Sequence, residues 1–215
     1  MKKIIKYLVP VAAALVAACA DISSQADLDK LTVDIARHSF RDQGQAKLSR
    51  LNQDDANREC SAADVAGKPI DEQAGRAIEQ ANFKTIQWPS DGKFLGDWKE
   101  GEKIAQNGRG MTWTDPAGSE NGGNCYNCHQ IDKKEISFGT IGPSLYNYGR
   151  LRGVIDPASP QAKPIVEYTW GKIWNARAYN ACSSMPRAGH AGILSEQQIR
   201  HVMALLLDPK SPVNQ

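Results

Sequence analysis

The stretch CYNCH at residues 125–129 constrains this chain more than any other feature, because it places two thiols and an imidazole within five positions. Zinc sites, redox-active dithiols and covalently attached haem all use patterns of this kind. A structural zinc site normally needs two cysteine pairs, and this chain has a single Cys-x-x-Cys. A thioredoxin-like dithiol follows a buried strand, whereas the loop-forming sequence DPAGSENGGN (residues 115–124) precedes this motif. The motif therefore favours covalent haem.

The chemistry of haem attachment accounts for each residue of the motif. Two thiols on one turn can form thioethers with both vinyl groups of a haem, and the adjacent imidazole can reach the iron from one face. We therefore predict one covalently bound haem c, attached at Cys125 and Cys128, with His129 as the first axial ligand of the iron.

The second axial position of the iron has several candidate ligands. Met203 lies on the apolar stripe of the last predicted helix, which favours a role in the core. Met185 precedes a proline and so lies on an extended segment that can present a thioether. We predict Met185 as the sixth ligand and His190 as the second choice. With both axial positions filled, the iron would carry electrons, and we predict no catalytic residue. The remaining candidates are Met111, His38 and His201.

Two cysteines, Cys60 and Cys182, stand apart from the motif. An even pair in an oxidising compartment is expected to form a disulfide, which here would restrain the loop that carries Met185. A reactive cysteine persulfide or a thiolate ligand of the haem remains an alternative use of these residues.

The first residues of the chain indicate export. A basic start is followed by an apolar run at residues 7–18 that is too short to span a bilayer. We predict a signal peptide over residues 1–20, with ordinary cleavage after Ala20. The sequence VAAC at residues 16–19 also resembles a lipobox, in which cleavage precedes a lipidated Cys19. Either route predicts a periplasmic protein, which would contact the membrane only if it is lipidated.

Charge gives no sign of a nucleic-acid partner. The formal net charge of +2 includes three lysines of the predicted signal peptide, so the mature chain is close to −1. The sequence also lacks a run of basic residues with interleaved aromatic residues.

The rest of the sequence predicts a predominantly helical protein, because apolar residues recur at spacings of three and four and no strand-like alternation occurs. The loop WPSDGKFLG (residues 88–96) is the expected boundary between an N-terminal helical extension, residues 21–95, and a main domain, residues 96–215. The last helix is the clearest, since Ser195 and Gln198 make a capping-box pattern. Helices are predicted over residues 26–52, 71–82 and 165–178, and the first of these can be interrupted at Gly44. Two more helices begin at residues 97 and 195, and they end at NGRG (residues 107–110) and at Pro209.

With these residues identified, the chain resembles the class I cytochromes c and, more narrowly, the SoxX family, the monohaem subunits of bacterial SoxAX thiosulfate-oxidising complexes. The resemblance extends over nearly the whole mature chain, and MPRAGHAGIL is its most specific part. The segments that show the resemblance are residues 40–60, 82–110, 125–129, GPSLYNYG at 142–149 and CSSMPRAGHAGILSEQQIRHVMALLLDP at 182–209.

This resemblance implies an all-α class I cytochrome c fold with an N-terminal helical extension. It assigns Pro143 the backbone carbonyl that accepts a hydrogen bond from the proximal imidazole, and it supports His129 and Met185 as axial ligands. Ala188 stands where an aromatic residue is expected in the MPRxGH stretch, which affects the shielding of the haem near Met185.

The resemblance also implies a place in an enzyme complex. In that family the partner subunit, SoxA, carries the haem at which thiosulfate is joined to a cysteine of the SoxYZ carrier protein, an L-cysteine S-thiosulfotransferase activity. This chain would be the non-catalytic redox subunit of the heterodimer and would pass electrons to an acceptor cytochrome. An independent periplasmic electron shuttle is the alternative, and a gas- or peroxide-reactive haem protein would require an open sixth position.

Overall fold

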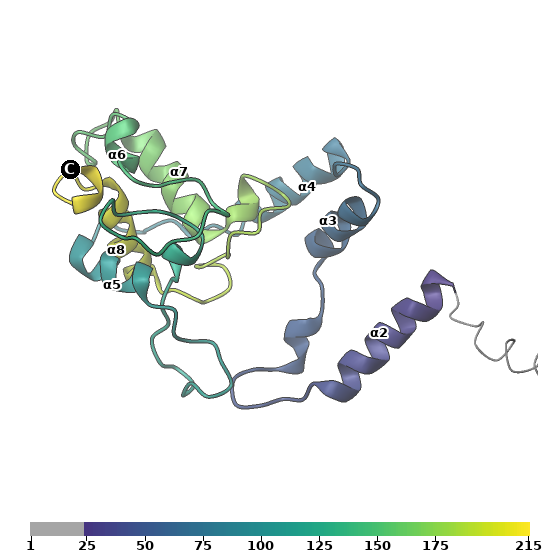
Figure 1. The fold of residues 1–215 in the computed structure, drawn as a ribbon. Coiled ribbons are helices and arrows are strands. Elements are labelled where there is room, and N and C mark those ends of the chain that lie inside the picture. The colour runs from purple at the N-terminus through teal and green to yellow at the C-terminus, as the bar shows by residue number, and fades with distance from the viewer. Residues whose placement is uncertain (1–23) are drawn as a thin grey trace, which may run out of the picture. The chain divides into compact units, whose positions relative to one another are not determined.

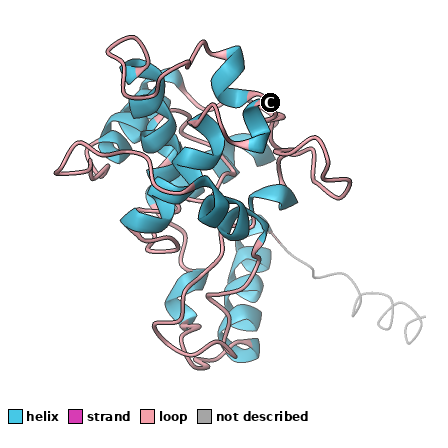
Figure 2. Cartoon of the chain, turned by 90° about the vertical axis from the view of Figure 1, so that its left-hand side faces the viewer, coloured by secondary structure: helices cyan, strands magenta, loops and turns pink. Residues whose placement is uncertain are grey.

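The structure, a computed structural model, describes residues 24–215, so the predicted signal peptide and Cys19 lie outside the described residues. Helices and connecting loops account for this part of the chain, and Figure 2 shows no strand in it. The only β-type pairing among these residues is an isolated bridge between Gln43 and Ala46. No helix within residues 24–215 has both the length and the apolar character needed to cross a bilayer.

The chain divides into two compact units. Among the described residues, the first comprises 24–42 and Lys47–Leu51, and the second comprises Gln43–Ala46 and Asn52–Gln215. The second unit therefore contains residues 52–95 together with the predicted main domain, so much of the predicted extension packs in the same unit as that domain.

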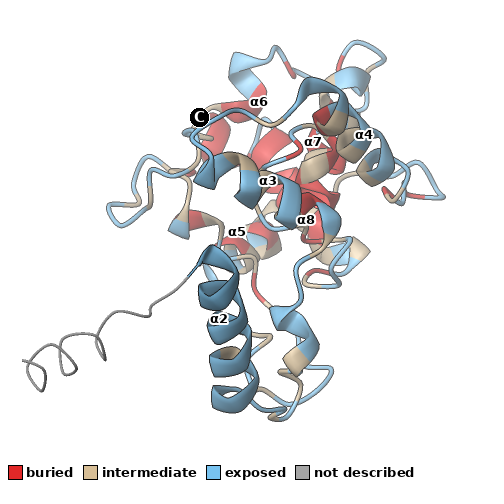
Figure 3. Ribbon diagram, turned by 90° about the vertical axis from the view of Figure 1, so that its right-hand side faces the viewer, coloured by how far each residue is buried: buried red, intermediate tan, exposed pale blue. Residues whose placement is uncertain are grey.

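The first unit contains helix α2, Gln25–Ser39, and a short 3-10 helix, Leu48–Leu51. The predicted helix over 26–52 is too long, because Phe40 adopts an extended backbone conformation and Gly44 adopts a positive φ of 51°. No residue of α2 is buried, and its apolar stripe is open to solvent. Figure 3 shows this helix as almost entirely exposed.

The second unit contains the remaining helices (Figure 1). Helix α3 was not predicted, because it has a single buried residue, Ala56, and hence no clear apolar stripe. Helices α4, α5 and α8 lie within a few residues of their predicted ranges. The bounds are α3 Asp55–Val65, α4 Glu72–Phe83, α5 Trp98–Gln106, α6 Tyr148–Leu151, α7 Lys163–Trp174 and α8 Glu196–Leu207, with 3-10 helices Cys125–Asn127, Ala176–Ala178 and Pro212–Asn214.

Helix α8 forms the centre of the core. The predicted capping box is present, with the Ser195 hydroxyl accepting from Gln198 N and the Gln198 side chain accepting from Ser195 N. A Cβ atom on Gly101 of α5 would overlap the His201 carbonyl, so this glycine permits the close contact of the two helices. Met203 is completely buried, as its position on the apolar stripe predicted. Figure 3 shows the buried residues gathered along α7 and α8.

The segment between α4 and α5 is attached to α7 and α8. The indole N–H of Trp170 donates to the Gln87 carbonyl, and that of Trp174 donates to the Thr85 carbonyl. Gly96 N donates to the Arg200 carbonyl at 2.8 Å. These contacts attach both ends of the predicted boundary loop, residues 88–96, to α7 and α8.

Candidate haem site

The CYNCH motif forms a single tight turn at the surface of the core. Asn124 adopts a left-handed conformation with φ 49° and introduces the 3-10 helix Cys125–Asn127. The Cys125 carbonyl then accepts hydrogen bonds from Cys128 N at 3.1 Å and His129 N at 2.9 Å. Both cysteine thiols are free. Burial raises the pKa of the Cys125 thiol to about 11, so in the absence of a thioether bond this sulfur is protonated at neutral pH.

The imidazole of His129 is oriented by the loop that follows the motif. Its Nδ1–H donates to the Pro143 carbonyl at 2.7 Å, which leaves Nε2 as the lone-pair nitrogen of the neutral ring. Gly142 N donates to the Cys128 carbonyl at 2.8 Å, and a Cβ atom on Gly142 would overlap the imidazole ring. The contact between Pro143 and His129 is therefore the one that the family resemblance implies.

A buried tyrosine within the motif ties the turn to α5. The Tyr126 hydroxyl donates to the Glu102 carboxylate at 3.0 Å and accepts from Asp132 N at 3.2 Å. Burial raises the pKa of both Tyr126 and Glu102 above their ordinary values. Sequence reasoning missed these partners, because only the fold brings Glu102 to the turn.

Met185 lies on the segment between α7 and α8. Its side chain is half-buried and packs against the hydrophobic core, as Cys125 does. Ala188 N donates to the Ile173 carbonyl at 3.2 Å, and Ala188 is buried. The Trp174 indole lies so close to the next residue that a Cβ on Gly189 would overlap it. This segment thus follows the surface of α7, with a large aromatic ring of α7 beside the position of the expected aromatic residue.

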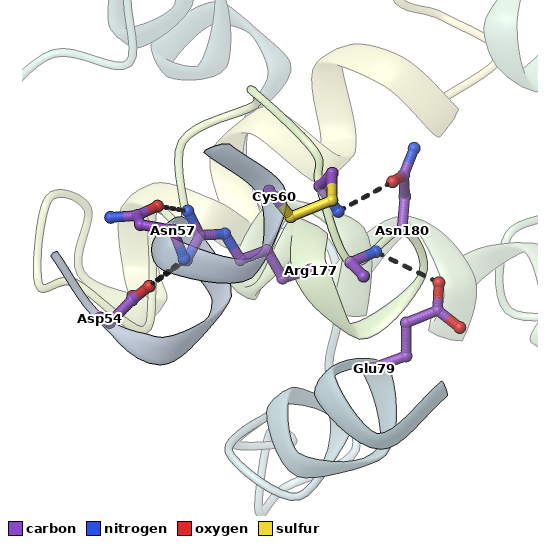
Figure 4. The surroundings of a disulfide bond; sticks show 8 residues. Asp54, Asn57, Cys60, Glu79, Arg177 and Asn180 are labelled. Carbon is purple, nitrogen blue, oxygen red and sulfur yellow. Dashed lines mark hydrogen bonds and ion pairs between the residues drawn. A yellow bond between two sulfur atoms is a disulfide. The ribbon is translucent and has the colours of Figure 1, made fainter. Parts of the chain in front are cut away.

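A disulfide connects this segment to the N-terminal part of the second unit. Cys60 of α3 and Cys182 are bonded, with their Cα atoms 5.6 Å apart. Polar contacts surround the bond (Figure 4): the Glu79 carboxylate accepts from Ala181 N, and the Asn180 side chain accepts from Cys182 N, both at 3.2 Å. Cys182 lies three positions before Met185, so the restraint acts close to that residue.

The structure separates the other candidate iron ligands by their environments. Met203 is enclosed in the core, and the His201 Nδ1 accepts a hydrogen bond from Asp97 N at 2.8 Å. His38 belongs to the first unit, where its Nδ1 donates to the Asp34 carbonyl. Met111 has a positive φ of 63° and is half-buried. His190 is exposed as a whole residue, but desolvation of its ring by the surrounding protein, together with repulsion by Arg187, lowers its pKa.

The residues of the turn fit a covalent haem. The site offers two unpaired thiols on one turn, an imidazole with its lone-pair nitrogen unengaged by Pro143, and an apolar core that adjoins Cys125 and Met185. When bound, haem c supplies an iron that accepts and returns one electron. The thiols of the turn would hold the haem, the Pro143 carbonyl orients His129, and the apolar core beside Cys125 and Met185 would offer the haem an apolar environment.

Comparison with known proteins also indicates a c-type cytochrome. The family model described as cytochrome c matches residues 98–209, just over half of the chain. An uncharacterized lipoprotein of Aquifex aeolicus (strain VF5) is 39% identical over 132 residues, which are 60% of this chain and 58% of that protein. The helical architecture confirms the predicted all-α class. The chain therefore belongs to the cytochrome c family and is an electron-transfer protein with covalently bound haem c.

Proposed function

We propose that this chain is the monohaem redox subunit of a SoxAX-type complex. In the reaction, a carrier cysteine and thiosulfate form an S–S bond, the cysteine S–H bond breaks, and one proton and two electrons are released. A partner cytochrome of the SoxA type would hold the reacting groups. This chain would accept the electrons one at a time and deliver them to an acceptor cytochrome.

The observation that carries this proposal is the attachment of α3 to the Met185 segment. The Cys60–Cys182 disulfide joins the part of the chain before the cytochrome c match to the segment with the family-specific sequence MPRAGHAGIL. An independent electron carrier has no need of such an addition, whereas a subunit can use it to present a surface to a partner. The shuttle therefore remains the second candidate.

We assign the haem chemistry to four residues. Cys125 and Cys128 would form the thioethers, and His129 and Met185 would ligate the iron. The hydrogen bond from His129 to Pro143 supports this assignment, because it fixes the tautomer in which Nε2 can bind a metal. Met185 is favoured over Met203 and His201 because those side chains are engaged in the core or by Asp97. Ligation by His and Met suits electron transfer at a raised potential.

Affinity purification tests the assembly. A tagged chain is isolated from cells grown on thiosulfate, and the eluate is stained for covalent haem. We expect a second cytochrome in equimolar amount, and its removal should abolish reduction of this chain by thiosulfate and SoxYZ. If the chain elutes alone and is reduced without a partner, the subunit proposal fails and the independent shuttle is favoured.

We also propose export and lipid anchoring at Cys19. The Aquifex aeolicus relative is described as a lipoprotein, which supports this interpretation of the VAAC sequence. One acyl chain anchors weakly, so stable attachment requires several. Labelling with radioactive palmitate should mark the wild type and leave Cys19→Ser unlabelled. An unlabelled wild type that is released as a soluble periplasmic protein would favour ordinary cleavage after Ala20.

A further inference from the structure

One carboxylate, that of Asp54, lies between two arginines that flank Met185 in the sequence. Arg177 Nη1 donates to both carboxylate oxygens of Asp54 at 2.9 Å, and Arg187 Nη2 donates to Oδ2 at 2.9 Å. Arg177 precedes Met185 by eight positions and Arg187 follows it by two. Figure 4 shows Asp54 and Asn57 of the α3 start around the Arg177 guanidinium.

The two arginines of these ion pairs are more shielded from water than the carboxylate. The Arg177 and Arg187 side chains are 14% and 27% exposed and that of Asp54 is 39% exposed, so water replaces a lost partner less readily at the arginines. Burial raises the pKa of Asp54, but the hydrogen bonds from Asn57 N and Arg177 and the attraction of both arginines outweigh this effect and lower it. Asp54 is therefore ionised at neutral pH, and its single negative charge is shared by two guanidinium groups.

Helix α3 holds the Met185 segment at three points. Asp54 caps the N-terminus of α3 and forms ion pairs with Arg177 and Arg187. Cys60, about 9 Å further along the axis of α3, forms the disulfide with Cys182. The disulfide fixes the segment before Met185, and the Arg187 contact fixes it after Met185. Backbone hydrogen bonds attach the continuation, where His190 N donates to the Trp174 carbonyl at 3.0 Å.

We propose that Asp54 is a positioning residue for the sixth haem ligand. Through Arg177 and Arg187 it keeps the Met185 segment against the core, so that the thioether remains on the iron. The inference rests on the proposed ligation by Met185. It gives the region before the cytochrome c match an influence on the haem that acts through the Met185 segment and is separate from any role in partner binding.

Cyanide binding to the ferric holoprotein tests this assignment, because cyanide can bind the iron only after the methionine leaves. The test variant is Asp54→Asn, since asparagine retains an oxygen that can cap α3 but loses the charge. The matched control is Asp55→Asn, because Asp55 is the adjacent acid, is 90% exposed and, among residues 24–215, forms an ion pair with Arg58 alone. The rate at saturating cyanide, followed at the methionine–iron charge-transfer band, reports the opening of the site.

We expect Asp54→Asn to open about tenfold faster than the wild type, and Asp55→Asn to remain within about twofold of it. Arg187→Gln, which removes one of the two contacts, should give a smaller acceleration and provides a second variant if Asp54→Asn folds poorly. Equal opening rates in the wild type, Asp54→Asn and Arg187→Gln would overturn the inference, even if Asp54→Asn unfolds more easily. If the wild type itself lacks the charge-transfer band, the proposed Met185 ligation fails, and the inference fails with it.

Discussion

Removing the disulfide between α3 and the Met185 segment should lower the stability of the protein by several kcal/mol. The double variant Cys60→Ser/Cys182→Ser breaks a link between residues 122 positions apart. In the chain-entropy description, a disulfide that closes a loop of this length raises the free energy of the unfolded chain by about 4.9 kcal/mol at 25 °C. The variant lacks this restriction of its unfolded state and is less stable by that amount. The ion pairs of Asp54 persist in the folded variant, so the folded segment is expected to keep its place.

Guanidinium chloride unfolding of the oxidised holoprotein measures this effect. The variant should unfold at lower denaturant with a steeper slope, because its unfolded chain is more expanded and exposes more surface. The control is the same titration with both proteins in a reductant, which reduces the haem iron of each and breaks the disulfide of the wild type: under these conditions the two proteins should have equal stability.

A loss below about 1 kcal/mol with an unchanged slope would refute the reasoning. It would mean that the unfolded chain is already compact between α3 and the Met185 segment. In that case the disulfide would contribute only to the local position of Cys182.

Further predictions concern the ligands and one surface ion pair. Met185→Ala should remove the methionine–iron band and admit cyanide rapidly, as seen by absorbance. Gly142→Ala should lower the yield of holoprotein or alter its haem spectrum, because the added Cβ overlaps the His129 ring. Hydrogen bonds from Arg200 lower the pKa of Asp91 to about 2, below its unfolded value of 3.8, so this pair stabilises above that value and its contribution disappears as the pH falls towards 2. Asp91→Asn should therefore lose less stability than the wild type between about pH 5 and pH 2 in urea titrations, and equal losses would contradict this.

The features that could be predicted from the sequence are those that neighbouring residues determine. The Cys125–His129 turn depends on hydrogen bonds within five residues, and the start of α8 depends on Ser195 and Gln198. The disulfide followed from the even number of remaining cysteines and an oxidising compartment. Each of these arguments needs no knowledge of the tertiary structure.

The features that escaped prediction depend on distant residues or on weak local signals. Helix α3 buries one alanine, so periodicity gave no signal, although Asp54 before an exposed polar run is a possible N-cap. The contacts of Asp54 span 123 and 133 positions, and the Glu102–Tyr126 contact spans 24. Sequence patterns hold no information on which acids and bases meet at such separations.

The two sides of the proposed haem site therefore differ in how they are built. The attachment side is a local turn closed by the Pro143 loop, so most distant substitutions should leave haem attachment intact. The Met185 side depends on contacts with α3 and α7 that only the complete fold supplies. A change in α3 can thus alter the lability of the sixth ligand without affecting the thioethers. A partner that binds near α3 would then have a physical route by which to influence electron transfer at the iron.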